Sequence, residues 1–193
     1  MRRPAVVAAA LVVAAAAAVL VVRHEQPGWW VRLWYPLDYS QVVSGNARLY
    51  HLDPALVAAV IYQESQFDAH ARSSAGAVGL MQLLPDTARG IAIHTGGTNF
   101  NPSTDLLDPD LNVRYGCWYL RHLRQKYHRY RNGDELALAA YNAGQANVDS
   151  WIARTPAGQD VEIPFPETRA YIDDVERLQR LYRRAYHSEL YGS

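Results

Sequence analysis

A single glutamate, Glu64, carries the chemistry that the sequence indicates most strongly. In the segment ALVAAVIYQES it follows Val57, Val60 and Ile61 at the helical spacing i, i+3, i+4 and i+7, so it continues an apolar stripe. Burial disfavours an ionised carboxylate and would raise its pKa to about 6–7, the range of a general acid near neutral pH. The alternative is a glutamate at a helix end that reaches solvent or a backbone donor.

A second catalytic carboxylate is difficult to identify. Hydrolysis of a glycosidic bond by water usually needs two carboxylates, one as the acid and the other as nucleophile or base. The other acidic residues at or near expected helix ends are better explained as caps or first-turn acids; they are Asp68, Asp86, Asp105, Asp108, Asp110 and Glu167. The residues alone therefore indicate one acid and no strong partner.

Other classes of chemistry leave no trace in the sequence. The seven histidines form no HExxH pair, the lone Cys117 has no evident partner histidine, and no glycine-rich phosphate loop follows a strand. Ser65 does not lie in the GxSxG turn of a hydrolase. Nineteen basic and nineteen acidic residues cancel, which gives no general attraction to nucleic acid. We therefore expect no metal ion and no cofactor, and we expect Cys117 to be a small core residue.

Helical periodicity predicts an all-α domain, because no strand-like alternation of any length appears. Asp53-Pro54 is a strong start signal, with a capping side chain before a proline at the first helical position. We predict helices over residues 38–52, 54–65, 85–95, 108–127, 134–142, around 148–152 and over 168–190, with loops at 67–79, 99–107 and 155–166. Besides the helix over 54–65, two of these helices have apolar stripes, Val113, Cys117, Leu120 and Leu123 in one and Tyr171, Val175, Leu178 and Tyr182 in the other.

The N-terminus carries a candidate membrane segment. Arg2 and Arg3 precede an uncharged run of Ala, Val and Leu over residues 4–22, close to the roughly 20 residues that cross a bilayer. No convincing cleavage region follows, so we expect residues 1–24 to be an uncleaved transmembrane anchor, with a removed signal peptide as the alternative. The folded domain, residues 38–190, would then lie outside the cytoplasmic membrane. Residues 25–37 are rich in aromatics and form either a juxtamembrane belt or a lead-in packed on the domain.

Three ordered motifs resemble the signature of soluble-lytic-transglycosylase (SLT-type) catalytic domains. They are Glu64-Ser65-Gln66-Phe67 with Gly79-Leu80-Met81-Gln82, then the AlaTyrAsnAlaGly segment at 140–144, then the segment from Pro164 to Tyr171. The resemblance covers about residues 40–182 and implies a goose-type, lysozyme-like α-helical domain. It also implies cleavage of the MurNAc–GlcNAc β-1,4 bond of peptidoglycan without water. In that family one glutamate protonates the leaving oxygen and then accepts the proton of the muramoyl 6-hydroxyl, which yields a 1,6-anhydromuramoyl end.

The resemblance further implies roles for individual residues. Glu64 corresponds to the single acid/base. The residues matched to substrate contacts are Ser65, Met81, Gln82, Tyr141, Asn142, Glu167 and Tyr171. Met81 is expected to line the groove, and several of the others have structural alternatives. Ser65 could finish its helix, Gln82 could brace the loop, Tyr141 and Tyr171 could pack in the core, and Glu167 could cap a helix.

Two other functions stay open at this point. One is a hydrolytic glycosidase of the lysozyme or chitinase type on the same fold, and the other is a glycan-binding module without catalysis. The expected partners are peptidoglycan glycan strands and, through the N-terminal helix, the membrane. The sequence does not identify a protein partner.

Overall fold

The computed structural model describes residues 11–17, 19, 25–97 and 99–192. The chain divides into two compact units, residues 1–36 and 37–193. In the first unit, helix α2 (Gly28–Trp34) pairs the ring of Trp30 with those of Trp29 and Trp34, at centroid distances of 5.9 and 5.4 Å. Most of the expected membrane segment lies outside the described residues. Within the described residues, no helix is long and apolar enough to cross a membrane.

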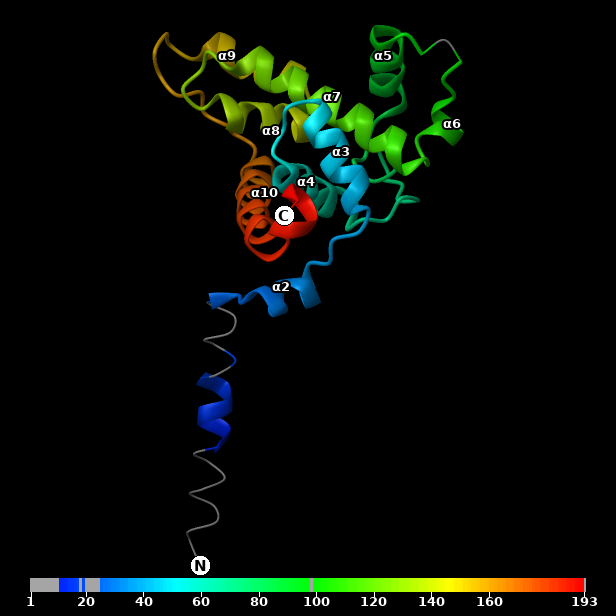
Figure 1. Ribbon diagram of the computed structural model, residues 1–193. Helices are drawn as coiled ribbons and strands as arrows, with labels where there is room; N and C mark the ends of the chain where they lie inside the picture. Colours follow the sequence, from blue (N-terminus) through cyan, green and yellow to red (C-terminus); the bar gives the residue numbers. More distant parts are fainter. Residues whose placement is uncertain (1–10, 18, 20–24, 98, 193) are drawn as a thin grey trace, which may run out of the picture. The chain divides into compact units, whose positions relative to one another are not determined.

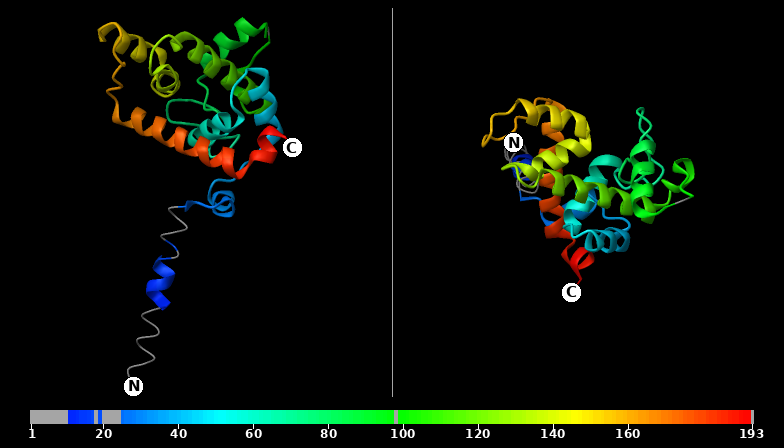
Figure 2. Two further views of the ribbon diagram at one scale, coloured as in Figure 1. Left: turned by 60° about the vertical axis from the view of Figure 1, so that its left-hand side comes forward. Right: turned by 90° about the horizontal axis from the view of Figure 1, so that it is seen from above.

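The second unit is built from helices (Figures 1 and 2). They are α3 (Ser40–Leu49), α4 (Pro54–Ser65), α5 (Pro85–Thr95), α6 (Pro102–Asp105), α7 (Pro109–Tyr127), α8 (Gly133–Ala143), α9 (Gln145–Arg154), α10 (Pro166–Ala185) and α11 (His187–Tyr191). The described part of the chain contains no strand, only two isolated bridges that Val78 makes with Arg72 and Leu83. The prediction of an all-α domain is therefore confirmed.

Helix α4 occupies the centre of this unit. Every residue from Pro54 to Ile61 is buried, as expected for a helix that is apolar on all sides. Helix α10 packs along α4 in the antiparallel direction, because Tyr171 contacts Glu64 at one end while Gln179 contacts Asp53 at the other. The figures show α10 beside α4 in the same way. This packing brings an early residue of α10 to the last turn of α4.

Helix α7 is the second long support. It packs against α8 and α3, and its start and middle contact α5 through a small core that includes Val78, Leu83, Ile91 and Tyr115. Both predicted apolar stripes, in α7 and in α10, are buried. Cys117 is a free, fully buried thiol, and burial raises its pKa, so the expectation of a core cysteine is confirmed.

Two predicted boundaries are wrong. The segment 99–107 contains α6, because the Asn101 side chain accepts a hydrogen bond of 3.1 Å from the Ser103 amide and Pro102 stands at the first helical position. The last helix does not run unbroken to Leu190. It ends at Ala185, Tyr186 leaves the helical conformation with ψ of 34°, and the short α11 follows.

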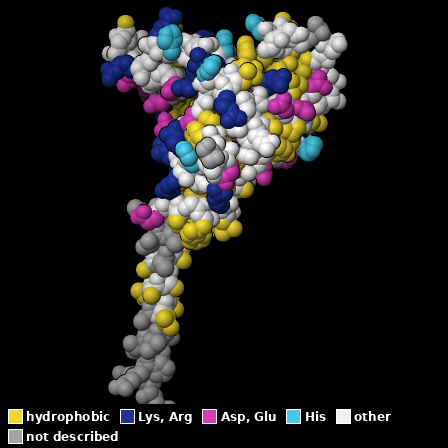
Figure 3. Space-filling model, viewed as in Figure 1, with side chains coloured by type: hydrophobic (Ala, Val, Ile, Leu, Met, Phe, Trp, Pro, Cys, Tyr) yellow, Lys and Arg dark blue, Asp and Glu magenta, His cyan; other side chains and the backbone are white. Residues whose placement is uncertain are grey.

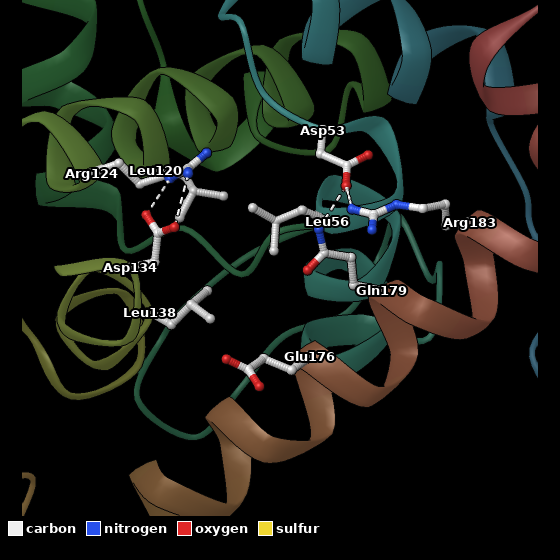
Figure 4. A pocket seen from close by; sticks show the side chains of 9 residues that line it. All are labelled: Asp53, Leu56, Leu120, Arg124, Asp134, Leu138, Glu176, Gln179 and Arg183. Carbon is white, nitrogen blue, oxygen red and sulfur yellow. Dashed lines mark hydrogen bonds and ion pairs between the residues drawn. The ribbon is translucent and has the colours of Figure 1, made fainter. Parts of the chain in front are cut away.

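Asp53 joins the start of α4 to the C-terminal part of the chain. Its carboxylate caps α4 by accepting from the Ala55 amide at 3.0 Å, and it also accepts hydrogen bonds from Gln179, Arg183 and Tyr191. Asp53 and Arg183 line a cavity of about 280 Å³ whose walls come from α4, α7, α8 and α10 (Figure 4). Burial alone would raise the pKa of Asp53, but the hydrogen bonds from Tyr191, Arg183 and Gln179 outweigh it and lower the pKa.

We expect Asp53→Asn to lower the free energy of unfolding by about 1–2 kcal/mol at pH 7, because asparagine still caps α4 but gives no charge to Arg183. A carboxylate whose pKa is lowered by folding stabilises the protein above its unfolded pKa, about 4, and loses that contribution as the pH falls through the folded value. Urea unfolding of both proteins at pH 7 and pH 3 measures the difference, which should shrink at pH 3. An equal difference at both pH values would contradict a role for the charge.

Candidate active site

Glu64 lies in the last turn of α4 and faces α10. The hydroxyl of Tyr171 donates a hydrogen bond of 2.7 Å to Oε1 of Glu64. Burial raises the pKa of Glu64 to about 7, although the hydrogen bond from Tyr171 acts in the opposite direction. This value lies in the range that the apolar stripe predicts. The carboxyl group can therefore give up and take back a proton near neutral pH.

The chain reverses sharply directly after the glutamate. Gln66 and Phe67 both adopt the left-handed conformation, with φ of 52° and 66°, which is costly for residues other than glycine. The reversal buries Phe67 against Tyr182 of α10, with ring centroids 6.2 Å apart. This end of α4 therefore contacts α10 at two points, through the Glu64–Tyr171 hydrogen bond and the Phe67–Tyr182 ring contact.

The loop that follows α4 returns to the same helix end. Ser65 donates a hydrogen bond of 2.8 Å to the carbonyl of Leu80, and it also lies 3.2 Å from the carbonyl of Ile61. Gln82 has a φ of 46° and donates through Nε2 to the carbonyls of Ala71 and Gly79 at 3.1 and 2.9 Å. The Gln82 amide nitrogen therefore braces the loop, and Oε1 is the part of that side chain left to accept from a ligand.

Helix α8 reaches the loop through Tyr141. Its hydroxyl donates a hydrogen bond of 2.8 Å to the carbonyl of Met81, and its ring lies 5.5 Å from that of Tyr119. Burial, followed by the nearby charge of Glu64, raises the pKa of Tyr141 well above its ordinary value, so the phenol stays protonated. The side chain of Met81 is fully buried, so the expectation that it lines a groove is not met, and Met81 contributes its backbone carbonyl instead.

The last two matched residues stand where α8 ends and α10 begins. Asn142 is exposed, and its Oδ1 lies 2.9 Å from the hydroxyl of Thr168, which is buried. Glu167 is exposed in the first turn of α10, a position that also suits interaction with the helix dipole. The structure thus brings Ser65 and Tyr141 together at the Leu80-Met81 turn. It also brings Glu64 of α4 to Tyr171 of α10.

Sequence reasoning missed two polar residues at this site. Thr168 lies inside the third motif, and its spacing of three and seven residues from Tyr171 and Val175, which puts it on the apolar stripe, was the available signal. Asn112 is a buried amide on α7, one position before the apolar stripe that begins at Val113. In the described part of the chain, no group of three or more His, Cys, Asp or Glu side chains is arranged to hold a metal ion.

Comparison with known proteins gives consistent matches. The family model described as the transglycosylase SLT domain matches residues 41–163. The soluble lytic murein transglycosylase of Salmonella typhimurium is 30% identical over 154 residues, which cover 77% of this chain and 23% of that protein. The membrane-bound lytic murein transglycosylase C of Mannheimia succiniciproducens is 30% identical over 168 residues, covering 76% of this chain and 47% of that protein.

Solved structures agree with the sequence matches. An inactive variant of the lytic transglycosylase Slt from Pseudomonas aeruginosa superposes with a TM-score of 0.72 at 30% identity, over 89% of this chain and 28% of that one. The chain therefore spans only about a quarter of the length of such soluble relatives. The lysozyme-like helical fold that the motifs imply is confirmed. The chain belongs to the family of transglycosylase SLT domains.

Proposed function

We propose that this protein is a peptidoglycan lytic transglycosylase in which Glu64 is the only acid/base. The Glu64 carboxylic acid protonates the glycosidic oxygen between MurNAc and GlcNAc as the bond from the MurNAc C1 breaks. The resulting carboxylate accepts the proton of the MurNAc 6-hydroxyl, whose oxygen bonds to C1. The products are a free GlcNAc hydroxyl and a 1,6-anhydromuramoyl end, and no water is consumed.

The observation that carries this proposal is the partly buried Glu64 carboxyl group, whose pKa is raised to about 7 and whose hydrogen-bond partner is the Tyr171 hydroxyl, not a second carboxylate. Its shift results from burial and from Tyr171, and no second carboxylate among the described residues contributes to it. Retaining and inverting hydrolases place their two carboxyl groups within about 10 Å of each other. A mechanism that takes its nucleophile from the substrate needs only one, and it gains the proximity advantage of an intramolecular reaction.

Other residues supply positions and contacts in this proposal. Tyr171 and Tyr141 stay protonated because burial and the charge of Glu64 raise their pKa values. Asn142, Glu167 and Oε1 of Gln82 are assigned to sugar binding, and Ser65 holds the loop beside the glutamate. On the face seen in Figure 3 basic and acidic side chains are interspersed, so these local contacts, not a field of one sign, would select the glycan.

We place the enzyme outside the cytoplasmic membrane, anchored by residues 1–24. The support is the apolar run after Arg2 and Arg3, together with the existence of membrane-bound relatives. The segment 25–37 would then connect the anchor to the domain at 38–190.

Mass spectrometry of the muropeptides that the purified full-length chain releases from peptidoglycan tests the activity. We expect anhydromuropeptides, lighter by one water than hydrolytic products. Reducing ends that carry oxygen from labelled water would identify a hydrolase and overturn the proposal. Glycan binding without release, in conditions where wild-type protein is folded, would indicate a binding module.

Tyr171→Phe should shift the pH profile of the reaction. The Tyr171 hydroxyl stabilises the Glu64 carboxylate, so its removal raises the pKa of Glu64 above about 7. We expect the alkaline limb of the kcat profile to move upward by about one pH unit and kcat to fall about tenfold, because the carboxylate becomes harder to form. A downward shift would mean that water replaces the phenol, against the proposed role.

A further inference from the structure

Three helices converge on two consecutive residues of the loop, Leu80 and Met81. Ser65 of α4 donates to the carbonyl of Leu80, and Tyr141 of α8 donates to the carbonyl of Met81, each at 2.8 Å. From α7, Oδ1 of Asn112 accepts from the Met81 amide, also at 2.8 Å. Two of these three side chains neighbour Glu64. We propose that Asn112 is a positioning residue of the active site, which acts by fixing the Leu80-Met81 backbone against α7; this rests on the function proposed above.

Asn112 is suited to this role because both hydrogens and the oxygen of its side-chain amide form hydrogen bonds. Its Nδ2 donates to the carbonyls of Val78 and Leu106, each at 2.9 Å, while Oδ1 holds the Met81 amide. The residue is only 1% exposed, so water cannot replace a lost partner without local rearrangement. One side chain thus joins the loop, the segment before α7 and α7 itself.

Two glycines indicate how closely the loop is pressed onto α7. Gly79 has a φ of 81°, and a Cβ there would lie 2.3 Å from Nδ2 of Asn112 and 2.5 Å from the carbonyl oxygen of Leu106. Gly116 is one helical turn beyond Asn112, and a Cβ there would lie 2.2 Å from Sδ of Met81. The loop therefore has little freedom to shift along α7 while the amide of Asn112 is in place.

Movement of the loop would affect Glu64 through its neighbours Ser65 and Tyr141. The hydroxyls of Ser65 and Tyr141 would lose their acceptors if the carbonyls of Leu80 and Met81 moved. The pKa of Tyr141 responds to the charge of Glu64, so these two groups are electrostatic neighbours. Since small misplacements of catalytic groups slow chemistry strongly, the effect should fall on kcat and less on KM.

The first test compares Asn112→Leu with Asn46→Leu in the full chain. Asn46 is a second buried amide, 4% exposed, which bonds Asp110 at the start of α7 but not the loop. With solubilised glycan strands as substrate, we expect kcat of Asn112→Leu to fall at least about tenfold with KM changed less than about threefold. The Met81 amide, followed by NMR hydrogen exchange, should exchange at least about 100-fold faster. Asn46→Leu should keep kcat and Met81 protection within about threefold, even if its stability falls equally.

A second pair of variants guards against failure of Asn112→Leu to fold. Gly79→Ala leaves Asn112 intact but pushes the loop away from it, and should also lower kcat and expose the Met81 amide. Gly158→Ala is the matched control, because Gly158 has the same φ of 81° and open space around it. It carries the same backbone strain without touching the loop, so kcat should be unchanged.

Two results would overturn the proposal. One is wild-type kcat in a folded Asn112→Leu or Gly79→Ala protein, and the other is unchanged Met81 exchange in both. Failure of the proposed function is distinguishable, because wild type would then release no anhydro products. In that case the readout is the pKa of Glu64, measured by carboxyl NMR, instead of kcat. We expect this pKa to fall from about 7 toward its ordinary value in Asn112→Leu but not in Asn46→Leu.

Discussion

Glu64→Gln should leave less than about one-thousandth of the wild-type release of anhydromuropeptides, because general acid and general base catalysis each contribute about 10²–10⁴-fold. Glutamine occupies the same volume and can still hydrogen-bond to Tyr171, but it can neither give nor take the proton. One residue performs both steps in the proposed mechanism, so no other carboxylate compensates. The measurement is initial release rates at pH 7, with products identified by mass spectrometry.

Stability provides the control for this variant. The folded pKa of Glu64, about 7, lies above its ordinary value of 4.5, so folding favours the protonated acid. Its contribution to stability is intact below about pH 4.5 and is lost as the pH rises through 7. Glu64→Gln should therefore be more stable than wild type at pH 8 by about 3 kcal/mol and nearly equal to it at pH 4. A variant that is inactive and also less stable at pH 8 would not support the assignment.

Tyr141→Phe measures how much activity is lost when a residue beside Glu64, but not Glu64 itself, is changed. It removes the hydroxyl that bonds the Met81 carbonyl but leaves Glu64 in place. We expect a smaller loss of activity than in Glu64→Gln. Equal activity of the Glu64 variant and wild type would overturn the proposed mechanism.

Gly116→Ala should destabilise the protein by about 1–3 kcal/mol, the usual cost of inserting a methyl group into a packed core. Alanine would ordinarily favour a helix over glycine by about 0.5–1 kcal/mol. At this position its Cβ would lie 2.2 Å from Sδ and 2.8 Å from Cβ of Met81, whose side chain is fully buried. The clash therefore outweighs the helical preference and pushes the loop that Tyr141 and Ser65 hold.

Gly45→Ala is the matched control, since Gly45 is an exposed helical glycine of α3 with nothing within 4 Å of a new Cβ. It should stabilise the protein by about 0.5–1 kcal/mol, so the two substitutions should have opposite signs. Urea unfolding of both variants at pH 7 makes the comparison. Stabilisation by Gly116→Ala would mean that Met81 repacks without cost.

The sequence by itself determined most of the helices and the position of the candidate acid on an apolar helix face. Asp53-Pro54 starts α4 through a cap and a fixed proline φ, both of which act within a few residues. The stripes of α7 and α10 are buried because helical periodicity states which face of a helix is apolar. The same periodicity placed Glu64 on the buried face. Asn101-Pro102 carries the same local start signal, and α6 could have been predicted from it.

Only the tertiary structure decided what each polar side chain contacts. Tyr171 and Glu64 are 107 positions apart, and Tyr141 is 60 positions from the carbonyl that it bonds. Ser65 and Gln82 donate hydrogen bonds to backbone carbonyls of the loop, and the Met81 side chain is buried in the core. Asn112 accepts a hydrogen bond from the Met81 amide. Periodicity predicts which face of a helix is buried, but it does not predict which side chains pack against that face. Hydrogen-bond partners depend on how helices distant in the chain pack together.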